Sequence, residues 1–123
     1  MQIMAKHSEE GSLEGLGWID AEVRKFNFNE NFNNLKIPHM GWNNIILKKK
    51  SKLISDNDQK SRYYFVHSYY MYANKRKDIL AETEYGIQFA CSIEKNNLFG
   101  VQFHPEKSHK YGMKILKNFS NIV

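Results

Sequence analysis

The sequence of 123 residues has one cysteine and no long hydrophobic run, and both shortages exclude classes of protein. Its single thiol, Cys91, cannot form a disulfide within the chain, which predicts a reducing compartment rather than a secreted, disulfide-stapled domain. No stretch approaches the roughly 18 consecutive apolar residues of a membrane helix, and the first ten residues do not resemble a signal peptide. We therefore expect a soluble, cytoplasmic protein with no membrane partner.

Basic residues outnumber acidic ones, giving a formal net charge of +5 and an isoelectric point near 9.3. That balance suits an acidic partner. However, the lysines gather in one run at residues 48–52, and no arginine-rich helix or aromatic RNA-binding platform accompanies them. We interpret the run as a solvated loop and expect no nucleic-acid partner. A hydrophobic content of 41% is typical of a globular chain, and the length fits one domain at most.

Hydrophobic patterning predicts a strand-rich chain with a helix at each end. Apolar residues at Met1, Met4 and Ala5 favour a short amphipathic helix before the glycines that begin at Gly11. Strands are predicted over 21–26, 63–66, 79–85, 87–93 and 98–103, with a hairpin turn at Asn96-Asn97. The spacing of apolar residues over 111–123 predicts a closing amphipathic helix.

Three segments have less regular patterns. The asparagine-rich residues 27–34 indicate a turn or a small surface insertion. Pro38, within the segment 36–47, favours an edge strand or the start of a strand. The polar residues 48–60 are compatible with a loop or a frayed helix.

The sharpest local feature is Gly-Val-Gln-Phe-His-Pro-Glu-Lys-Ser at residues 100–108. Pro105 biases His104 toward an extended conformation, in which His104 and Glu106 would face the same side. An imidazole beside a carboxylate is the base-and-orienter half of a nucleophilic triad. A structural His–Glu pair at a strand end is the alternative, which the spacing of two residues alone favours.

Two further segments could present functional groups. His67 and Ser68 follow an apolar strand directly, at the end of the strand where α/β sheets bind ligands, although a simple strand-to-loop transition explains them equally. The Pro-, Gly- and Asn-containing segment 37–44 presents Met40 and Trp42, either as anchors of a protein interface or as core residues. Cys91 lies inside an apolar strand, which predicts a small core residue rather than a nucleophile.

Taken together, three motifs are specific where each alone is not. Pro-His-Met-Gly-Trp-Asn at 38–43, Tyr-Phe-Val-His-Ser-Tyr-Tyr at 64–70 and the 100–108 motif occur in this order, after an opening Met-Gln and the stretch 7–19. They resemble the glutaminase subunits of imidazole glycerol phosphate synthase, which are class I glutamine amidotransferases. The resemblance extends to about Phe119 and implies an α/β fold. Residues 1–123 would form the C-terminal part of a flavodoxin-like amidotransferase domain, strand-rich with a closing helix.

This resemblance also implies a chemistry: glutamine is hydrolysed by a Cys–His–Glu triad, and the ammonia passes to a partner (β/α)8-barrel synthase in histidine biosynthesis. His104 would be the general base and Glu106 its orienter, while Gln2 and Ser68 would bind the substrate. The surface that contacts the synthase would contain Met40, Trp42, Asn43, Tyr64 and Lys107. Neither a metal nor a cofactor is implied.

The nucleophile is the largest departure from the family. In relatives the cysteine lies in a Gly-x-Cys-Leu-Gly turn immediately before the Met-Gln with which this sequence opens. We therefore expect residues 1–123 alone to lack measurable glutaminase activity and to associate or aggregate, because the first strands of the sheet are also missing. Two alternatives stay open: a paralogue that supplies ammonia for the amidination of surface sugars, and a non-catalytic module that docks on a barrel synthase through the Trp42 loop.

Overall fold

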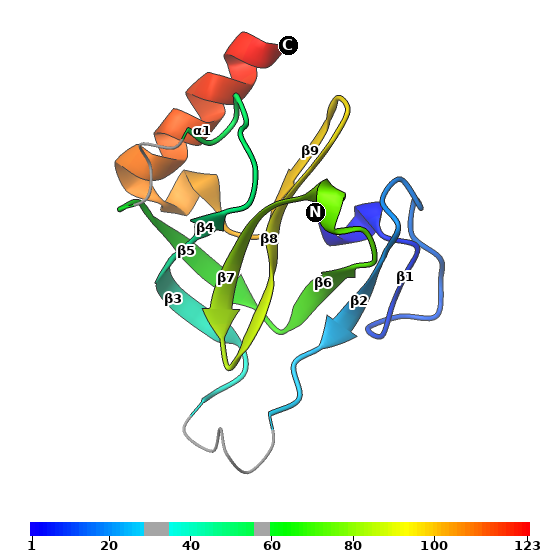
Figure 1. Ribbon diagram of the computed structural model, residues 1–123. Helices are drawn as coiled ribbons and strands as arrows, with labels where there is room; N and C mark the ends of the chain where they lie inside the picture. Colours follow the sequence, from blue (N-terminus) through cyan, green and yellow to red (C-terminus); the bar gives the residue numbers. More distant parts are fainter. Residues whose placement is uncertain (29–34, 56–59) are drawn as a thin grey trace.

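The computed structural model describes residues 1–28, 35–55 and 60–123, and most of its strands belong to one large sheet (Figure 1). Its strands lie in the order β1 (His7–Ser8), β2 (Ala21–Lys25), β6 (Tyr69–Ala73), β8 (Ile87–Lys95), β7 (Ile79–Tyr85) and β4 (Ile46–Leu47), and β9 (Leu98–Val101) also pairs with β8. Among these described strands β1 and β2 pair in parallel, and the other pairs are antiparallel.

A second, two-stranded sheet carries four of the five residues predicted at the partner interface. It pairs β3 (His39–Asn44) with β5 (Arg62–His67) in antiparallel register, from His39 opposite His67 to Asn44 opposite Arg62. Helix α1 (His109–Ile122) and the 3-10 turns η1 (Gln2–Met4), η4 (Arg76–Asp78) and η5 (Pro105–Lys107) complete the described elements.

The core consists of two apolar clusters. The larger is centred on the aromatic side chains of Phe26, Phe65, Phe89 and Phe103, and the smaller joins the N-terminal segment to β2, β6 and β8. Residues 89–93 of β8 are all buried, so both faces of this central strand are covered. Removing such large apolar side chains from water supplies most of the stability of the fold.

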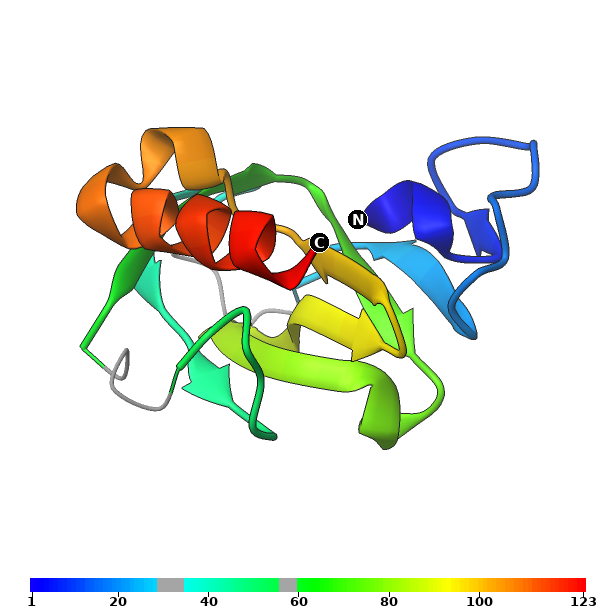
Figure 2. The same cartoon turned by 90° about the horizontal axis from the view of Figure 1, so that it is seen from above.

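Helix α1 lies beside β5, and its Phe119 ring meets that of Phe99 on β9 at 6.1 Å. In Figure 1 the helix lies at the upper left, on the other side from the N-terminal turn, and Figure 2 shows it from above. It buries Gly112 and Ile115. At Gly112 a Cβ atom would stand 1.8 Å from the carbonyl oxygen of Pro105, so only glycine allows the helix to pack this closely on η5. Within the described residues, no helix is long and apolar enough to cross a membrane.

Most predicted elements are confirmed: a mixed α/β, strand-rich fold closed by a C-terminal helix. Strands form within or around all five predicted strand segments, and β3 starts directly after Pro38. The hairpin turn is also found, with Asn96 in the left-handed conformation at φ 55°. Residues 29–34 of the predicted asparagine-rich turn and residues 56–59 of the lysine-rich segment lie outside the described residues.

The prediction of an amphipathic N-terminal helix was wrong. Only the single turn η1 forms, because the carbonyl oxygens that a helix would use are bonded elsewhere. Ile3 accepts from the N–H of Leu16, Ala5 from that of Gly17, and Lys6 from that of Gly15. The glycine-rich loop thus replaces the helical hydrogen bonds. Strand β6 was not predicted at all.

Candidate active site

The strongest predicted pair, His104 and Glu106, is in direct contact. Nδ1 of His104 lies 2.7 Å from Oε1 of Glu106. The backbone reaches this contact differently from the prediction: His104 is extended at φ −98°, ψ 101°, but Pro105 then begins the turn η5. Proline is favoured at the first position of such a turn, and the turn brings the carboxylate back to the imidazole.

The contact fixes the protonation of the imidazole. The pKa of Glu106 is lowered, first by its own backbone N–H and then by the hydrogen bond from His104. An ionised carboxylate can only accept, so Nδ1 of His104 carries the hydrogen. In the neutral imidazole, Nε2 is then the unprotonated nitrogen. This is the tautomer in which a histidine can take a proton from a nucleophile.

A cavity of about 710 Å³ brings together side chains from distant parts of the sequence. It is lined by residues of the amino-terminal turn, of the β5–β6 connection and of the segment after β9. They include Met1, Gln2, Glu10, Ser68, Tyr69 and His104. Three of the four predicted catalytic and substrate-binding residues therefore meet at one site. Glu106 is not among the lining residues and lies behind His104, on the side of Nδ1.

The amide of Gln2 is held in a defined orientation. Its Nε2 donates to the carbonyl oxygen of Tyr69 at 2.9 Å and to Oε1 of Gln102 at 2.7 Å. Both amide hydrogens are thereby used, which leaves the side-chain oxygen of Gln2 as an acceptor for another donor.

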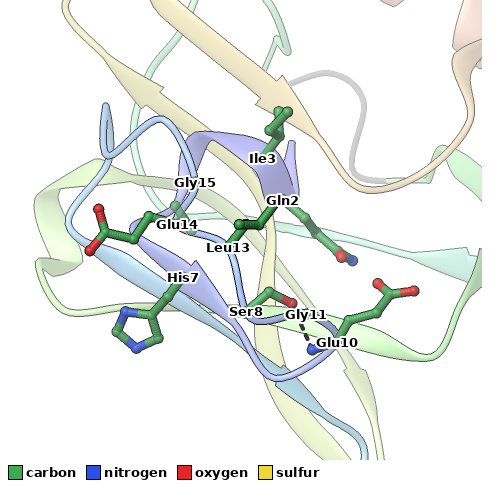
Figure 3. Close-up of a pocket in the computed structure, with 10 residues that line it drawn as sticks. Gln2, Ile3, His7, Ser8, Glu10, Gly11, Leu13, Glu14 and Gly15 are labelled. Atoms are coloured by element: carbon green, nitrogen blue, oxygen red, sulfur yellow. Dashed lines mark hydrogen bonds between the residues drawn. The ribbon is translucent and has the colours of Figure 1, made fainter.

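Glu10 is a lining residue that the sequence reasoning did not single out. It also lines a smaller neighbouring hollow of about 320 Å³, where its backbone N–H donates to Oγ of Ser8 at 3.1 Å. Figure 3 shows the side chains of Gln2 and Glu10 extending toward the same side, whereas His7 and Glu14 point away. In the sequence Glu10 stands out only as the second of two acidic residues before Gly11. No local pattern around it indicates a binding role.

Four of the five predicted partner-contact residues lie close together on the outer face of the two-stranded sheet and η5. Met40 is 61% exposed and Trp42 45% exposed, both on β3. The ring of Tyr64 meets that of Trp42 edge-on at 6.0 Å, and Nζ of Lys107 lies 5.9 Å from the Tyr64 ring. His109, which was not predicted, stacks flat on Trp42 at 5.2 Å. We call Met40, Trp42, Tyr64, Lys107 and His109 the docking face, after the role that the sequence predicts for the first four.

Asn43 points in another direction from its neighbour Trp42, because successive residues of a strand face opposite sides. Its Nδ2 donates to the carbonyl oxygen of Glu84 at 2.9 Å and contacts Nε2 of His39 at 3.2 Å. Its role at a partner surface stays a prediction.

Behind the docking face lies a pair of buried histidines. Nδ1 of His67 lies 2.7 Å from the carbonyl oxygen of Tyr69, which can only accept, so this nitrogen carries the hydrogen. Nε2 of His67 must then accept from Nδ1 of His39 at 2.9 Å, and Nε2 of His39 accepts from Asn43. The chain of bonds is complete when both imidazoles are neutral. Consistently, burial lowers the pKa of His67, and burial followed by the charge of His67 lowers that of His39 to about 4.

Cys91 is completely buried in β8, as predicted for a core residue. Burial raises the pKa of its thiol, which disfavours the reactive thiolate. Cys91 lines no part of the 710 Å³ cavity. Among the described residues, no group of three or more His, Cys, Asp or Glu side chains is placed to hold a metal ion.

Comparison with known proteins decides the family. Residues 1–122 match the family described as Glutamine amidotransferase class-I. The chain belongs to this family. It is similar to proteins named imidazole glycerol phosphate synthase subunit HisH: 44% identical over 99% of the chain in Leptospira interrogans, 50% over 97% in Methanococcus maripaludis and 45% over 99% in Pseudomonas aeruginosa.

This amidotransferase chain covers only part of those relatives, 60%, 57% and 59% of their respective lengths. A solved structure from Thermoplasma acidophilum, described as one subunit of a GMP synthase, has a similar fold with a TM-score of 0.65. It is 18% identical to this chain, and the match covers 87% of the chain and 50% of that structure. At this identity the likeness concerns the fold alone.

Proposed function

We propose that this chain is the His–Glu-bearing part of a glutamine amidotransferase subunit that supplies ammonia to an imidazole glycerol phosphate synthase in histidine biosynthesis. The observation that carries the proposal is the pairing of His104 with Glu106 at the edge of a cavity that Gln2 and Ser68 also line. A structural His–Glu pair has no need of such a cavity. The names of the relatives, which are subunits of that synthase, support the choice of pathway.

In the proposed reaction a thiolate attacks the side-chain amide carbon of glutamine, and His104 takes the thiol proton through Nε2. The imidazole returns the proton to the leaving ammonia, and water then hydrolyses the thioester to glutamate. Glu106 keeps the hydrogen on Nδ1 and stabilises the imidazolium that forms in between. In the family that this chain resembles, the attacking cysteine lies in a Gly-x-Cys-Leu-Gly turn immediately before the methionine that matches Met1. Met1 lines the same cavity as His104, which agrees with attack from that side.

The lining groups suit the polar ends of glutamine. The free side-chain oxygen of Gln2 and the hydroxyl of Ser68 can orient the substrate, and we add Glu10 as the partner of its α-ammonium group. A carboxylate and an ammonium group attract each other, and water in an open cavity weakens this attraction. We propose that this chemistry takes place in the cytoplasm, which the single, unpaired thiol of Cys91 supports.

Kinetics with matched histidine variants test the catalytic roles. The polypeptide that includes any coding sequence in frame before Met1 is purified with the barrel synthase of the same genome, and glutamate formation from glutamine is measured. His104→Ala should lower kcat by about a thousandfold or more, since an unassisted thiol attacks slowly. His7→Ala, which removes an exposed imidazole outside the cavity, should have little effect. Equal activity of the two variants would remove the proposed role of His104.

The docking face is proposed as the surface that contacts the barrel synthase. Large, half-exposed aromatic side chains are frequent hot spots of protein interfaces. Trp42 and Trp18 are 45% and 50% exposed, so Trp18→Ala is a matched control for Trp42→Ala. Only Trp42→Ala should weaken binding to the synthase, by about tenfold or more in the dissociation constant. Binding without any glutamine hydrolysis, even with the complete polypeptide, would instead favour a non-catalytic docking module.

A further inference from the structure

The turn that carries His104 and Glu106 is hydrogen-bonded to strand β5 at Tyr64. The backbone N–H of His104 donates to the carbonyl oxygen of Tyr64 at 2.9 Å, and the backbone N–H of Tyr64 donates to Oγ of Ser108 at 3.0 Å. The hydroxyl of Ser108 then donates to the carbonyl oxygen of His104 at 2.6 Å. These three bonds form a closed ring that joins both ends of the 104–108 turn to the same residue of the sheet.

Solvent water does not reach the hydroxyl of Ser108, because none of the residue's surface is exposed. Without the hydroxyl, the N–H of Tyr64 would lose its partner and the carbonyl of His104 would keep only the N–H of Lys107. Backbone groups shielded from water are rarely left unpaired. Ser108 also occupies the N-cap position of α1, yet its side chain makes no capping hydrogen bond to the helix. The hydroxyl therefore stabilises the turn and not the helix.

We propose that Ser108 is a positioning residue of the amidotransferase site. Its hydroxyl fixes the backbone of His104 on β5, and so holds the imidazole that Glu106 orients at the edge of the cavity lined by Ser68. A displacement of about 1 Å of a reacting group can cost a hundredfold in rate, so a bond that fixes the backbone of His104 on the sheet matters for the position of its imidazole. The consequence for rate rests on the proposed function, whereas the lock itself can be measured without any reaction.

The lock is tested by nuclear magnetic resonance with Ser108→Ala in the polypeptide that includes any coding sequence in frame before Met1, because residues 1–123 alone are expected to associate. Amide hydrogen exchange at Tyr64 and His104 should become about tenfold faster or more, while exchange in the central strand β8 stays unchanged. The Nδ1 signal of His104 should also shift, because its contact with Glu106 loosens. Ser120→Ala is the matched control: Ser120 lies in α1, is exposed and donates only to the carbonyl oxygen of Lys117.

Two further variants separate the hydroxyl from packing. Ser108→Thr keeps the hydroxyl, so its amide exchange and its Nδ1 signal should match those of the unsubstituted protein. Ser108→Cys keeps the volume but offers only a weak donor, so its amide exchange should lie between those of the unsubstituted protein and Ser108→Ala. The cysteine variant decides the matter if Ser108→Ala does not fold. The proposal is overturned if folded Ser108→Ala or Ser108→Cys exchanges like the unsubstituted protein, or if folded Ser108→Thr behaves like Ser108→Ala.

Kinetics then test the effect on chemistry. In a preparation that hydrolyses glutamine, Ser108→Ala should lower kcat about 10- to 100-fold with KM changed by no more than about twofold. A change confined to KM would contradict a positioning role. If the unsubstituted polypeptide, with any coding sequence in frame before Met1 and its synthase, does not hydrolyse glutamine, that result counts against the proposed function. The exchange and Nδ1 measurements still decide whether Ser108 locks the turn.

Discussion

Acidification should destabilise the fold through the buried pair of His39 and His67. The hydrogen-bond chain through the pair is complete when both rings are neutral, and the pKa of His39 falls from 6.5 to about 4 through burial and the charge of His67. Burial lowers the pKa of His67 as well. In the unfolded chain both imidazoles return to an ordinary pKa of about 6.5.

The sign of the effect follows from which state binds more protons. Between about pH 6.5 and 4 the unfolded chain is protonated at His39 and the folded chain is not, so the free energy of unfolding decreases as the pH falls. Above about pH 7.5 both states are neutral and the effect disappears, and below about pH 4 it levels off. For His39 alone the loss is about 2 kcal/mol at pH 5 and on the order of 3 kcal/mol at the acid limit. This is a large part of the roughly 5–15 kcal/mol of a typical domain.

Urea unfolding at a series of pH values, followed by tryptophan fluorescence, measures this dependence. His39→Phe removes the titrating group but keeps a ring between Phe65 and Tyr85, whose centroids lie 4.8 and 4.2 Å from that of His39. This variant should show a shallower decrease between about pH 7 and 5, whereas His7→Gln at an exposed position should keep the original slope. A free energy of unfolding that stays level or rises on acidification of the unsubstituted protein would refute the reasoning.

Three further predictions concern single positions. Gly112→Ala should lower the free energy of unfolding by about 1–3 kcal/mol, because its Cβ would overlap the Pro105 carbonyl, and this outweighs the better helix propensity of alanine. Denaturant unfolding measures the change, with Gly11→Ala as the control because a Cβ at Gly11 meets open space. The thiol of Cys91 should react with a thiol reagent only after unfolding, and rapid labelling of the native chain would contradict its burial. His109→Gly should change the free energy of unfolding by no more than about 1 kcal/mol, since glycine relieves the backbone strain at φ 49° and this offsets the lost stacking on Trp42. His109→Val should lower the free energy of unfolding by more, and equal melting temperatures of the two variants would argue against strain.

Local sequence patterns identified the elements that local interactions determine. The runs that become β7 and β8 are rich in apolar and β-branched residues, and α1 has its apolar residues at helical spacing. Strand β6 was missed because of its five residues only Met71 is buried, and its conformation depends on pairing with β2 and β8. The N-terminal helix was wrongly predicted for the same reason: hydrogen bonds from the loop at residues 15–17 to the carbonyl oxygens of residues 3–6 override the local pattern.

The site divides in a similar way. Family resemblance pointed to Gln2, Ser68 and His104, and the structure brings them to one cavity although 102 residues separate the first from the last. No sequence pattern could indicate that His39 and His67 bond to each other across 28 residues, or that Ser108 reaches back to Tyr64 across 44. These contacts exist only because β3, β5 and the 104–108 turn pack together.

Tyr64 connects the two halves of the proposed function, and the geometry of a strand limits how they can communicate. Its ring lies on the docking face against Trp42, while its backbone N–H and carbonyl hold the turn that carries His104. In a strand the side chains project perpendicular to the direction of the backbone hydrogen bonds. The aromatic side chain of Tyr64 can therefore be removed without breaking the three hydrogen bonds that join Tyr64, His104 and Ser108. Tyr64→Ala should therefore weaken binding of the barrel synthase while amide exchange at His104 stays slow. Ser108→Ala should speed up amide exchange at His104 while binding of the synthase stays unchanged. If both variants changed both properties equally, β5 would have to move as a whole when the partner binds.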